Sequence, residues 1–405
     1  MAFSATLFDR FSEVGDEWRA VDPMSPLFLS ERWMQSVENT IAADHRYAVV
    51  RDTRGVAVAA AAFYRVDASA YYFFNPISLV LDSSSLTSLD AWIGDEAAAA
   101  HDLAARVAAR REDFAPATIC GSLFGYTPAL IYSPALSTGE RRGVLDVILR
   151  AFDATAQEWR TPTRAFLYAA VEDEVLWEAL TERGGAPYVA AAECILPIVW
   201  GDFDAYLASL SQSARRHVRR DQRLFDESGI TLEYPDLASA AGDVAFLQAS
   251  LQAKHGPEFD VDAQLNVLSR IQRLFSDSAH VILARRDNHV VGASLFYFYE
   301  GVVYLKMNGY DYDSLSFRDS LYFVMNYNEL VRFAIREKAS AIQYGPEAYV
   351  PKARRGCRLE DRTCFIEAPD VPESRDLIAL LSEANRRRFS ALRSGDPLVD
   401  LRSEG

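Results

Sequence analysis

The stretch from Ala279 to Glu347 combines β-type and helical patterns in a fixed order, and it constrains the fold more than any other part of the chain. Apolar and β-branched residues form short runs separated by polar turns, which is typical of an antiparallel meander. A repeat of apolar residues at helical spacing follows, and a last short run stops at a Gly-Pro pair. In order, the β-type runs are 281–284, 290–298 and 302–307, the helical repeat is 321–338, and the last run is 341–344.

The first half of the chain repeats this plan in a weaker form. Ser30 precedes an apolar repeat and is predicted to cap a helix there. The expected strands are 47–51, 56–64, 71–74, 117–120, 165–171 and 191–198, the expected helices are 95–111, 141–159 and 174–183, and 76–91 is an expected loop. A chain of 405 residues is long for one core. We therefore predict an α+β (α/β) protein with domains at 1–199 and 200–405, each a mixed, largely antiparallel sheet flanked by helices.

Composition limits the function classes. Half of the residues are hydrophobic, which excludes a disordered chain. No apolar run reaches the roughly 18 residues that a membrane span needs, and the acidic N-terminal segment is unlike a signal peptide. These features predict a soluble, cytoplasmic protein. Cys120, Cys194, Cys357 and Cys364 form no C-x-x-C pair, so we expect buried thiols and no zinc or redox motif.

The charge of the chain is unevenly distributed. Residues 1–199 contain 16 arginines, 27 acidic residues and no lysine, whereas residues 200–405 contain 26 basic and 30 acidic residues. The overall net charge of −15 disfavours non-specific binding of nucleic acid over the whole surface. Basic residues nevertheless cluster at 215–223, 352–358 and 386–388. A local site for a polyanion in the second half is therefore possible.

Five segments follow one another in a recognisable order. They are SPLFLSERWMQSVE, LSQSARRHVRRDQRLFDESGITLE, LQASLQAKHGPEF, VVYLKMNGYD and QYGPEAYVPKARRGC. Together they resemble the FemABX-type aminoacyltransferases and their peptidoglycan biosynthesis/recognition relatives in the GNAT superfamily. The resemblance is strongest over residues 203–368. It implies two tandem GNAT-like domains, the first a degenerate domain on the acceptor side and the second carrying the transferase site.

The segment after the 302–307 strand bears on the donor. GNAT enzymes that use acyl-CoA place Arg/Gln-x-x-Gly-x-Gly/Ala there, and its backbone N–H groups bind pyrophosphate. This chain has NGYDYDSLSFRDSLYF instead, without the glycine pair, and Asp311, Asp313 and Asp319 would repel phosphate. In lacking this glycine pair, the chain resembles the aminoacyl-tRNA-dependent branch of the superfamily. We therefore expect aminoacyl-tRNA as the donor and no cofactor, with a CoA thioester as the alternative.

Acyl transfer to an amine needs a positioned acyl group and donors aimed at the developing oxyanion. Lys306 interrupts an apolar strand and is predicted to stabilise that oxyanion or to bind the tRNA 3′ end; protection of an edge strand is the alternative. Glu347 is predicted to accept the amine proton, although a loop carboxylate paired with Lys352 remains open. Tyr344 is a candidate proton relay or a packing residue. No metal motif is present.

The resemblance also suggests residues that bind the substrates. The predicted donor-binding residues are Arg215, Arg216, Arg219, Arg220, Lys352, Arg354 and Arg355. For the arginines at 215–220, a solvated helix face is the alternative. Lys254 matches a basic position of the family and is predicted to bind a carboxylate of the acceptor. We expect the acceptor to be a small amine-bearing molecule or a peptide, in natural-product or cell-wall biosynthesis.

Two other function classes stay open. An acyl-CoA-dependent N-acyltransferase would bind its cofactor in the split between the fourth and fifth strands of the second domain. A non-catalytic binding module would direct the Lys306 and Glu347 side chains away from any shared cavity. The sequence does not predict the oligomeric state.

Overall fold

The computed structural model describes residues 3–38, 44–81, 89–255, 261–369 and 372–395. These residues belong to two compact units: unit 1 lies within Met1–Glu193 and Leu359–Gly405, and unit 2 is Cys194–Arg358. The predicted boundary at residue 199/200 is close to the first crossing between the units. The prediction assigned the last segment to the second domain, whereas the described residues from Leu359 onward group with unit 1.

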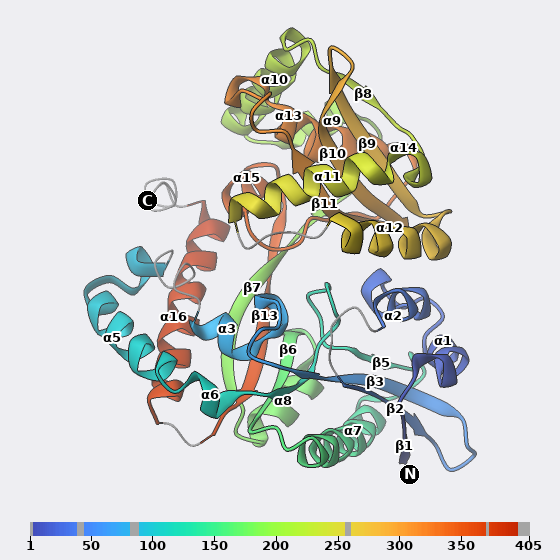
Figure 1. The fold of residues 1–405 in the computed structure, drawn as a ribbon, viewed down its shortest axis with the longest axis vertical. Helices are drawn as coiled ribbons and strands as arrows, with labels where there is room; N and C mark the ends of the chain where they lie inside the picture. Colours follow the sequence, from blue (N-terminus) through green and yellow to red (C-terminus); the bar gives the residue numbers. More distant parts are fainter. Residues whose placement is uncertain (1–2, 39–43, 82–88, 256–260, 370–371, 396–405) are drawn as a thin grey trace. The chain divides into compact units, whose positions relative to one another are not determined.

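Unit 1 contains strands on both sides of unit 2 in the sequence (Figure 1). Its strands are β1 (Ser4–Phe8), β2 (His45–Arg51), β3 (Ala57–Val66), β4 (Ala117–Cys120), β5 (Leu130–Tyr132) and β6 (Thr163–Ala170), together with β7 (Ala186–Pro197) up to Glu193 and β13 (Arg358–Glu367) from Leu359. Its α-helices include α1 (Gly15–Val21), α2 (Glu31–Val37), α3 (Pro76–Leu81), α5 (Ala97–Ala108), α6 (Arg111–Phe114), α7 (Thr138–Glu158), α8 (Glu174–Glu182) and α16 (Pro372–Ser394).

The sheet of unit 1 has the order β1-β2-β3-β4-β6-β13-β7, and β5 pairs with β3. Strands β1 to β4 are antiparallel, β4 and β6 are parallel, and β13 is antiparallel to β6. Helix α7 packs on this sheet, and Phe152 lies between the rings of Phe63 and Phe166, with centroid distances of 5.2 and 4.8 Å. The strand that returns from the C-terminal segment therefore completes the core of unit 1.

Two local predictions for unit 1 were wrong for one reason. Residues 71–74 were expected to form a strand and 76–91 a loop, but Tyr72–Phe74 forms a 3-10 helix and α3 begins at Pro76. The side chain of Asn75 accepts hydrogen bonds from the N–H groups of Ile77 and Ser78. An Asn cap followed by Pro in the first turn is a helix start signal. This local signal overrode the β-propensity of the aromatic run.

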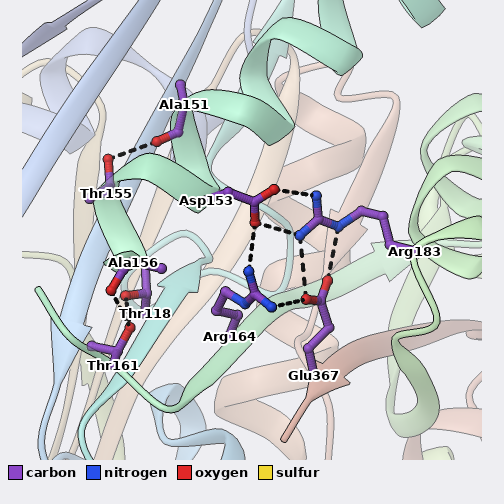
Figure 2. A network of polar contacts seen from close by, with 9 residues as sticks. All are labelled: Thr118, Ala151, Asp153, Thr155, Ala156, Thr161, Arg164, Arg183 and Glu367. Carbon is purple, nitrogen blue, oxygen red and sulfur yellow. Dashed lines mark hydrogen bonds and ion pairs between the residues drawn. The ribbon is translucent and has the colours of Figure 1, made fainter. Parts of the chain in front are cut away.

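Four charged side chains tie β13 to its neighbours in unit 1 (Figure 2). Arg183 after α8 contacts Asp153 of α7 at 2.6 Å and Glu367 of β13 at 2.9 Å. Arg164 of β6 contacts the same two carboxylates at 2.9 and 3.1 Å. Each carboxylate thus bridges two guanidinium groups, which makes the network more stabilising than an isolated exposed pair.

Unit 2 is formed by one continuous stretch of the chain. Its strands are β8 (Thr231–Glu233), β9 (Ala279–Arg286), β10 (His289–Tyr299), β11 (Val302–Tyr310) and β12 (Ala341–Gln343). Its helices are α9 (Phe203–Ser209), α10 (Gln212–Glu227), α11 (Leu237–His255), α12 (Val261–Phe275), α13 (Leu321–Phe323), a π-helical turn (Val324–Asn328), α14 (Glu329–Arg336) and α15 (Tyr349–Arg354). The predicted order of hairpin, third strand, helix and short strand is confirmed.

Helices cover both faces of the unit 2 sheet, whose order is β8-β9-β10-β11-β12. Phe296 and Tyr297 are neighbours in β10 and so point to opposite faces. Phe296 contacts Phe333 of α14, whereas Tyr297 contacts Phe275 of α12. Helix α11 crosses the sheet close to β11 (Figure 1), where a Cβ at Gly309 would lie 2.4 Å from the backbone of α11. Only glycine permits this approach.

The four cysteines are buried, as expected, and no disulfide bond joins these described residues.

Candidate active site

Strands β11 and β12 separate close to the residues that were predicted to be catalytic. They pair in parallel only over Val302–Tyr304 and Ala341–Gln343. Strand β12 ends there, while β11 continues to Tyr310. Past the last pair, β11 has no partner strand on this side among the described residues, and backbone groups at such an edge can bind a ligand. The split is therefore a candidate site for an extended acyl group.

Lys306 lies two residues beyond this last pair, in a β-bulge. Met307 pairs with Leu295 and Leu305 pairs with Phe296, so Lys306 is the extra residue between them. Bulges re-aim side chains and are over-represented next to active sites. The side chain is partly buried, and burial lowers the pKa of Lys306 to about 7. The ammonium group can therefore lose its proton close to neutral pH.

The loop after β12 is held by a second lysine. Lys352 is 4% exposed, and its Nζ donates to the carbonyl oxygens of Tyr344, Gly345 and Pro346 at 3.0, 2.8 and 2.8 Å. An ammonium group has three N–H donors, so these bonds engage all of them. These bonds give Lys352 a positioning role in the loop, and the donor contact predicted for it stays a prediction.

The same loop has an unusual backbone. Gly345, Glu347 and Ala348 have φ angles of 69°, 66° and 43°. Left-handed conformations at residues other than glycine cost free energy and persist only where the surroundings enforce them, often at functional sites. Glu347 is exposed within this constrained turn. Glu347, the predicted proton acceptor, thus lies on a loop whose conformation is held by the hydrogen bonds of Lys352.

Tyr344 is 4% exposed, and its hydroxyl has no hydrogen-bond partner among the described residues. Burial raises the pKa of Tyr344 well above its usual value. Its ring lies 5.0 Å from that of Tyr327, whose hydroxyl is 3.2 Å from that of Tyr322. Tyr344 therefore stays protonated at neutral pH and can donate a hydrogen bond. A role as proton relay stays a prediction.

A cavity of about 180 Å³ brings together two of the basic clusters. We call it the basic pocket. Its lining residues are Ala214, His217, Val218, Arg220 and Asp221 of α10, Ser320 and Phe323 at the start of the helix after β11, and Pro351, Arg354 and Arg355. Arg220 and Arg354 are exposed, and Arg355 is buried. One carboxylate among three arginines leaves the pocket electropositive, which suits a phosphate or carboxylate group.

Arg355 links the basic pocket to the tyrosines beside the β12 loop. Its Nη2 contacts Asp221 Oδ2 at 2.6 Å, and its guanidinium lies 4.4 Å from the Phe323 ring and 4.7 Å from the Tyr327 ring. Burial raises the pKa of Asp221, while the charge of Arg355 lowers it. The Nε of Arg355 has no partner among the described residues. Arg355 thus keeps one buried N–H donor that no described residue satisfies.

The other predicted binding residues have different outcomes. Arg215 donates to the carbonyl oxygens of Leu207, Ala208 and Leu210 at 2.8 to 3.0 Å. It therefore caps α9, and the donor contact predicted for Arg215 stays a prediction.

Arg216 and Arg219 are exposed on α10 outside the lining of the basic pocket. Lys254 lies in the last turn of α11, and its side chain is outside the described part of the structure.

Sequence reasoning missed three features of the site. His217 and Asp221 line the basic pocket, and the bulge at Lys306 was not foreseen. Asp221 could have been found, because it is the first carboxylate after the run of arginines. The loop after β11 also differs from expectation. Asp319 contacts Arg286 at 2.8 Å, and Asp311 accepts bonds from Ser314, so two of the three carboxylates are engaged within the loop region.

Comparisons with known proteins agree with this architecture. A family model named FemAB-like and described as peptidoglycan biosynthesis/recognition matches residues 102–366, more than half of the chain. The chain belongs to the FemAB-like family. No curated protein matches it. The predicted membership of a FemABX-like group within the GNAT fold is confirmed.

Solved structures show the same fold at low sequence identity. The crystal structure of FemX has a TM-score of 0.54 and 11% identity, covering 91% of this chain and 98% of FemX. A tandem GNAT protein from the clavulanic acid biosynthesis pathway has a TM-score of 0.50 and 12% identity, with coverages of 90% and 98%. A conserved protein of unknown function from Bacteroides thetaiotaomicron has a TM-score of 0.50 and 11% identity, with coverages of 90% and 100%.

The predicted fold of tandem GNAT-like domains is thereby confirmed, and the family supports a transferase role, in particular an acyltransferase. Among the helices that the structure describes, none is both long and apolar enough to pass through a bilayer.

Proposed function

We propose that this FemAB-like protein transfers an aminoacyl group from aminoacyl-tRNA to the amine of a small molecule or peptide, in natural-product or cell-wall biosynthesis. The observation that carries the proposal is the basic pocket, which combines Arg220 of α10 with Arg354 and Arg355. It lies where the chain enters the helix after β11, through Ser320 and Phe323. The sequence of this loop lacks the glycine-rich phosphate cradle. Arginine side chains are the available substitute for its backbone N–H groups.

The basic surface extends beyond the pocket, which favours a donor with several phosphates. Arg216, Arg219 and Arg220 are exposed on α10 at spacings of three and four residues, so they share one side of the helix. No acidic residue lies between Gln212 and Arg220. A row of cations suits successive phosphates of a nucleic-acid backbone better than one pyrophosphate group.

The proposed reaction requires no covalent enzyme intermediate. The neutral amine of the acceptor attacks the ester carbonyl of the donor, and the electron pair of the carbonyl moves onto oxygen. Lys306 in its protonated form stabilises this oxyanion. Glu347 takes the proton from the attacking nitrogen. When the tetrahedral intermediate collapses, the C–O bond to the ribose breaks, and the ribose oxygen leaves with the proton that Glu347 had taken from the amine.

A survey of donors tests the proposal. The purified protein is incubated with a pool of charged tRNA or with acyl-CoA thioesters, in each case with candidate amines, and the products are identified by mass spectrometry. We expect a product that requires charged tRNA and disappears when the tRNA is first digested by ribonuclease. Product formed from acetyl-CoA in the absence of tRNA would overturn the donor assignment.

An acyl-CoA-dependent N-acyltransferase is the second candidate. The separation of β11 from β12 favours it, because the parallel pairing ends after Tyr304 and leaves an edge that could bind an extended thioester. One protein of similar structure, the tandem GNAT protein from the clavulanic acid biosynthesis pathway, was solved in a form described as without AcCoA. The same survey decides between the candidates through the donor that gives product.

A further inference from the structure

The basic pocket is lined by three segments of unit 2, namely α10, the start of the helix after β11, and the segment around α15. Helix α10 packs against the 3-10 turn Phe317–Asp319 and against α13. Arg355 joins all three segments, because it contacts Asp221 at 2.6 Å and its guanidinium lies 4.4 Å from the Phe323 ring. The cavity of about 180 Å³ is many times larger than the roughly 10–15 Å³ that one water needs. A ligand group can therefore enter it.

The charges that line this cavity are mainly positive. Arg220, Arg354 and His217 are exposed at its lining, where a ligand can contact them. Asp221 supplies the one carboxylate among the lining residues, and it is engaged by Arg355, whose side chain is 6% exposed. Three guanidinium groups and one carboxylate leave two positive charges, without any contribution from His217. The cavity therefore matches the charge of a dianion.

The rest of the lining is apolar. It consists of Ala214, Val218, Phe323 and Pro351. These side chains gain no apolar contact from a bare inorganic anion, whereas they can pack against a sugar or a base that is attached to the anion. The lining thus favours a charged group that is carried by an organic moiety.

We propose that the basic pocket binds a phosphate monoester, and that in the donor this group is the 5′-terminal phosphate of the tRNA. Arg220 and Arg354 contact the phosphate oxygens, and Arg355 adds its charge from within the wall of the pocket. The monoester site follows from the lining of the pocket. Its assignment to tRNA rests on the function proposed above.

Charge and connectivity both favour a monoester over a phosphate within the RNA chain. A monoester carries a charge of about −1.5 to −2 at pH 7, close to the two positive charges of the pocket, whereas each phosphate within the chain carries one negative charge. A monoester also has a single link to the rest of its molecule, so it can enter a recess end-on. Arg216 and Arg219 are exposed outside the pocket lining and remain available to phosphates within the chain.

Small probes test the monoester site on the full chain by isothermal titration calorimetry. The probes are adenosine 5′-monophosphate, its methyl ester as the matched diester, and inorganic phosphate. We expect adenosine 5′-monophosphate to bind at least ten-fold more tightly than either of the others. Arg220→Gln and Arg354→Gln should each weaken its binding by ten-fold or more, because each removes charged hydrogen-bond donors. Arg223→Gln is the matched control and should bind like the wild type, because Arg223 lies on α10 outside the pocket lining and pairs with Glu227.

A second measurement identifies the source of the monoester. One uncharged tRNA is compared with its 5′ phosphate in place and after removal of this phosphate by phosphatase. We expect the removal to weaken binding by ten-fold or more in the wild type and in Arg223→Gln, and by less than two-fold in Arg220→Gln and Arg354→Gln. A general loss of folded protein would weaken both forms of the tRNA alike and would leave the difference between them intact.

The monoester site is overturned if the methyl ester binds as tightly as adenosine 5′-monophosphate, or if Arg220→Gln and Arg354→Gln bind the probes like the wild type. The assignment to tRNA is overturned if both forms of the tRNA bind equally to the wild type. A chain that distinguishes the two forms but transfers no aminoacyl group upholds the pocket and contradicts the proposed function. A chain that transfers from charged tRNA but binds both forms equally upholds the function and contradicts the assignment of the pocket to the 5′ end.

Discussion

Two lysines of unit 2 illustrate how burial can give one residue type different roles. The chain has only four lysines. Lys352 is surrounded by carbonyl oxygens that accept hydrogen bonds from all of its donors, so it fixes the loop after β12. Lys306 lies at a bulge where burial disfavours its charge. Lys352 therefore holds the loop in position, whereas Lys306 can gain or lose a proton close to neutral pH.

Replacement of Lys306 by Met should lower turnover by at least ten-fold, because donors to an oxyanion typically contribute ~2.7–4 kcal/mol. The pH dependence gives a second readout. The pKa of Lys306 in the folded chain is about 7, below its usual value of 10.5. The contribution of the ammonium group to turnover is therefore lost as the pH rises through about 7. In Lys306→Arg this loss should move to higher pH.

Stability should depend on Lys306 in the opposite direction. Between the folded-state pKa of about 7 and the usual value of 10.5, the unfolded chain binds the lysine proton more than the folded chain does, so the unfolding free energy rises with pH. Urea titrations across this range should show a steeper rise in the wild type than in Lys306→Met. Identical pH profiles of turnover in the wild type and Lys306→Arg would remove Lys306 from the mechanism.

Replacement of Lys352 by Met should release the β12 loop. Buried acceptors left without donors cost about 1–3 kcal/mol, and the left-handed residues Glu347 and Ala348 would relax. We expect a lower thermal midpoint and faster hydrogen exchange of the amides at 344–348. The exposed Lys338 is the control, and Lys338→Met should change neither quantity. Unchanged exchange in Lys352→Met would contradict the positioning role.

At the level of the elements, helix α10 connects the two parts of the site. One side chain of the helix, Asp221, holds Arg355, while Arg220 lines the basic pocket and Arg216 extends the charge outward. Arg215 contributes differently, because it satisfies the last carbonyl groups of α9. A single amphipathic helix thus combines structural and ligand-facing arginines, which its charge pattern alone could not separate.

The salt dependence of tRNA binding should report on this helix. Removal of one phosphate interaction with a single strand reduces the slope of log K against log salt concentration by ~0.7. Arg220→Gln and Arg354→Gln should therefore weaken binding of charged tRNA, and each should lower the slope by about that amount. Arg223→Gln is the matched control, because Arg223 lies on the same helix and pairs with Glu227. Equal slopes in all variants would exclude the basic pocket as a phosphate site.

At the scale of the whole molecule, one unit is formed by a continuous segment of the chain and the other by two separate segments. Unit 2 is continuous, whereas unit 1 needs β13 and α16 from the end of the chain. Strand β13 pairs with β6, and the network around Glu367 fixes it to α7 and α8 (Figure 2). Asn385 and Ser382 of α16 bond to the backbone of Val189 in β7. Unit 1 therefore cannot complete its core until the last segment has been synthesised.

Truncation after Arg358 should consequently unfold unit 1 and leave unit 2 folded. A strand without its neighbour exposes apolar surface and unpaired backbone groups. In calorimetry, the fragment 1–358 should show one cooperative unfolding transition fewer than the full chain. The fragment 194–358 should still unfold cooperatively. Native-like protection of β6 in the fragment 1–358 would contradict the role of β13. Full-length Glu367→Gln is a milder test, with an expected decrease in stability of roughly 1 kcal/mol for a partly exposed network.

Much of the fold could be predicted from the sequence because it depends on local periodicity. The hairpin of β9 and β10, strand β11, the helix from Leu321 and strand β12 are all encoded by alternating or helical apolar patterns. The helix beginning at Glu31 was predicted from Ser30, whose side chain accepts from the N–H of Trp33 as expected. The strand predicted at residues 71–74 was wrong, because Asn75 caps the helix that begins directly after this run. Local signals of this kind compete, and periodicity alone does not decide between them.

Tertiary structure alone decided which residues share a site. The sequence determined that arginines cluster at 215–223 and 352–358. Only the tertiary structure placed Arg220, Arg354 and Arg355 around one pocket and directed Arg215 to α9. The sequence also determined that Lys306 and Lys352 are rare charges among apolar residues. Lys352 bonds to carbonyl oxygens six to eight residues earlier in a folded loop, and Lys306 lies in a bulge that the register of β10 and β11 sets. The folded backbone, which periodicity in the sequence does not encode, therefore divided the basic residues between structural roles and the candidate site.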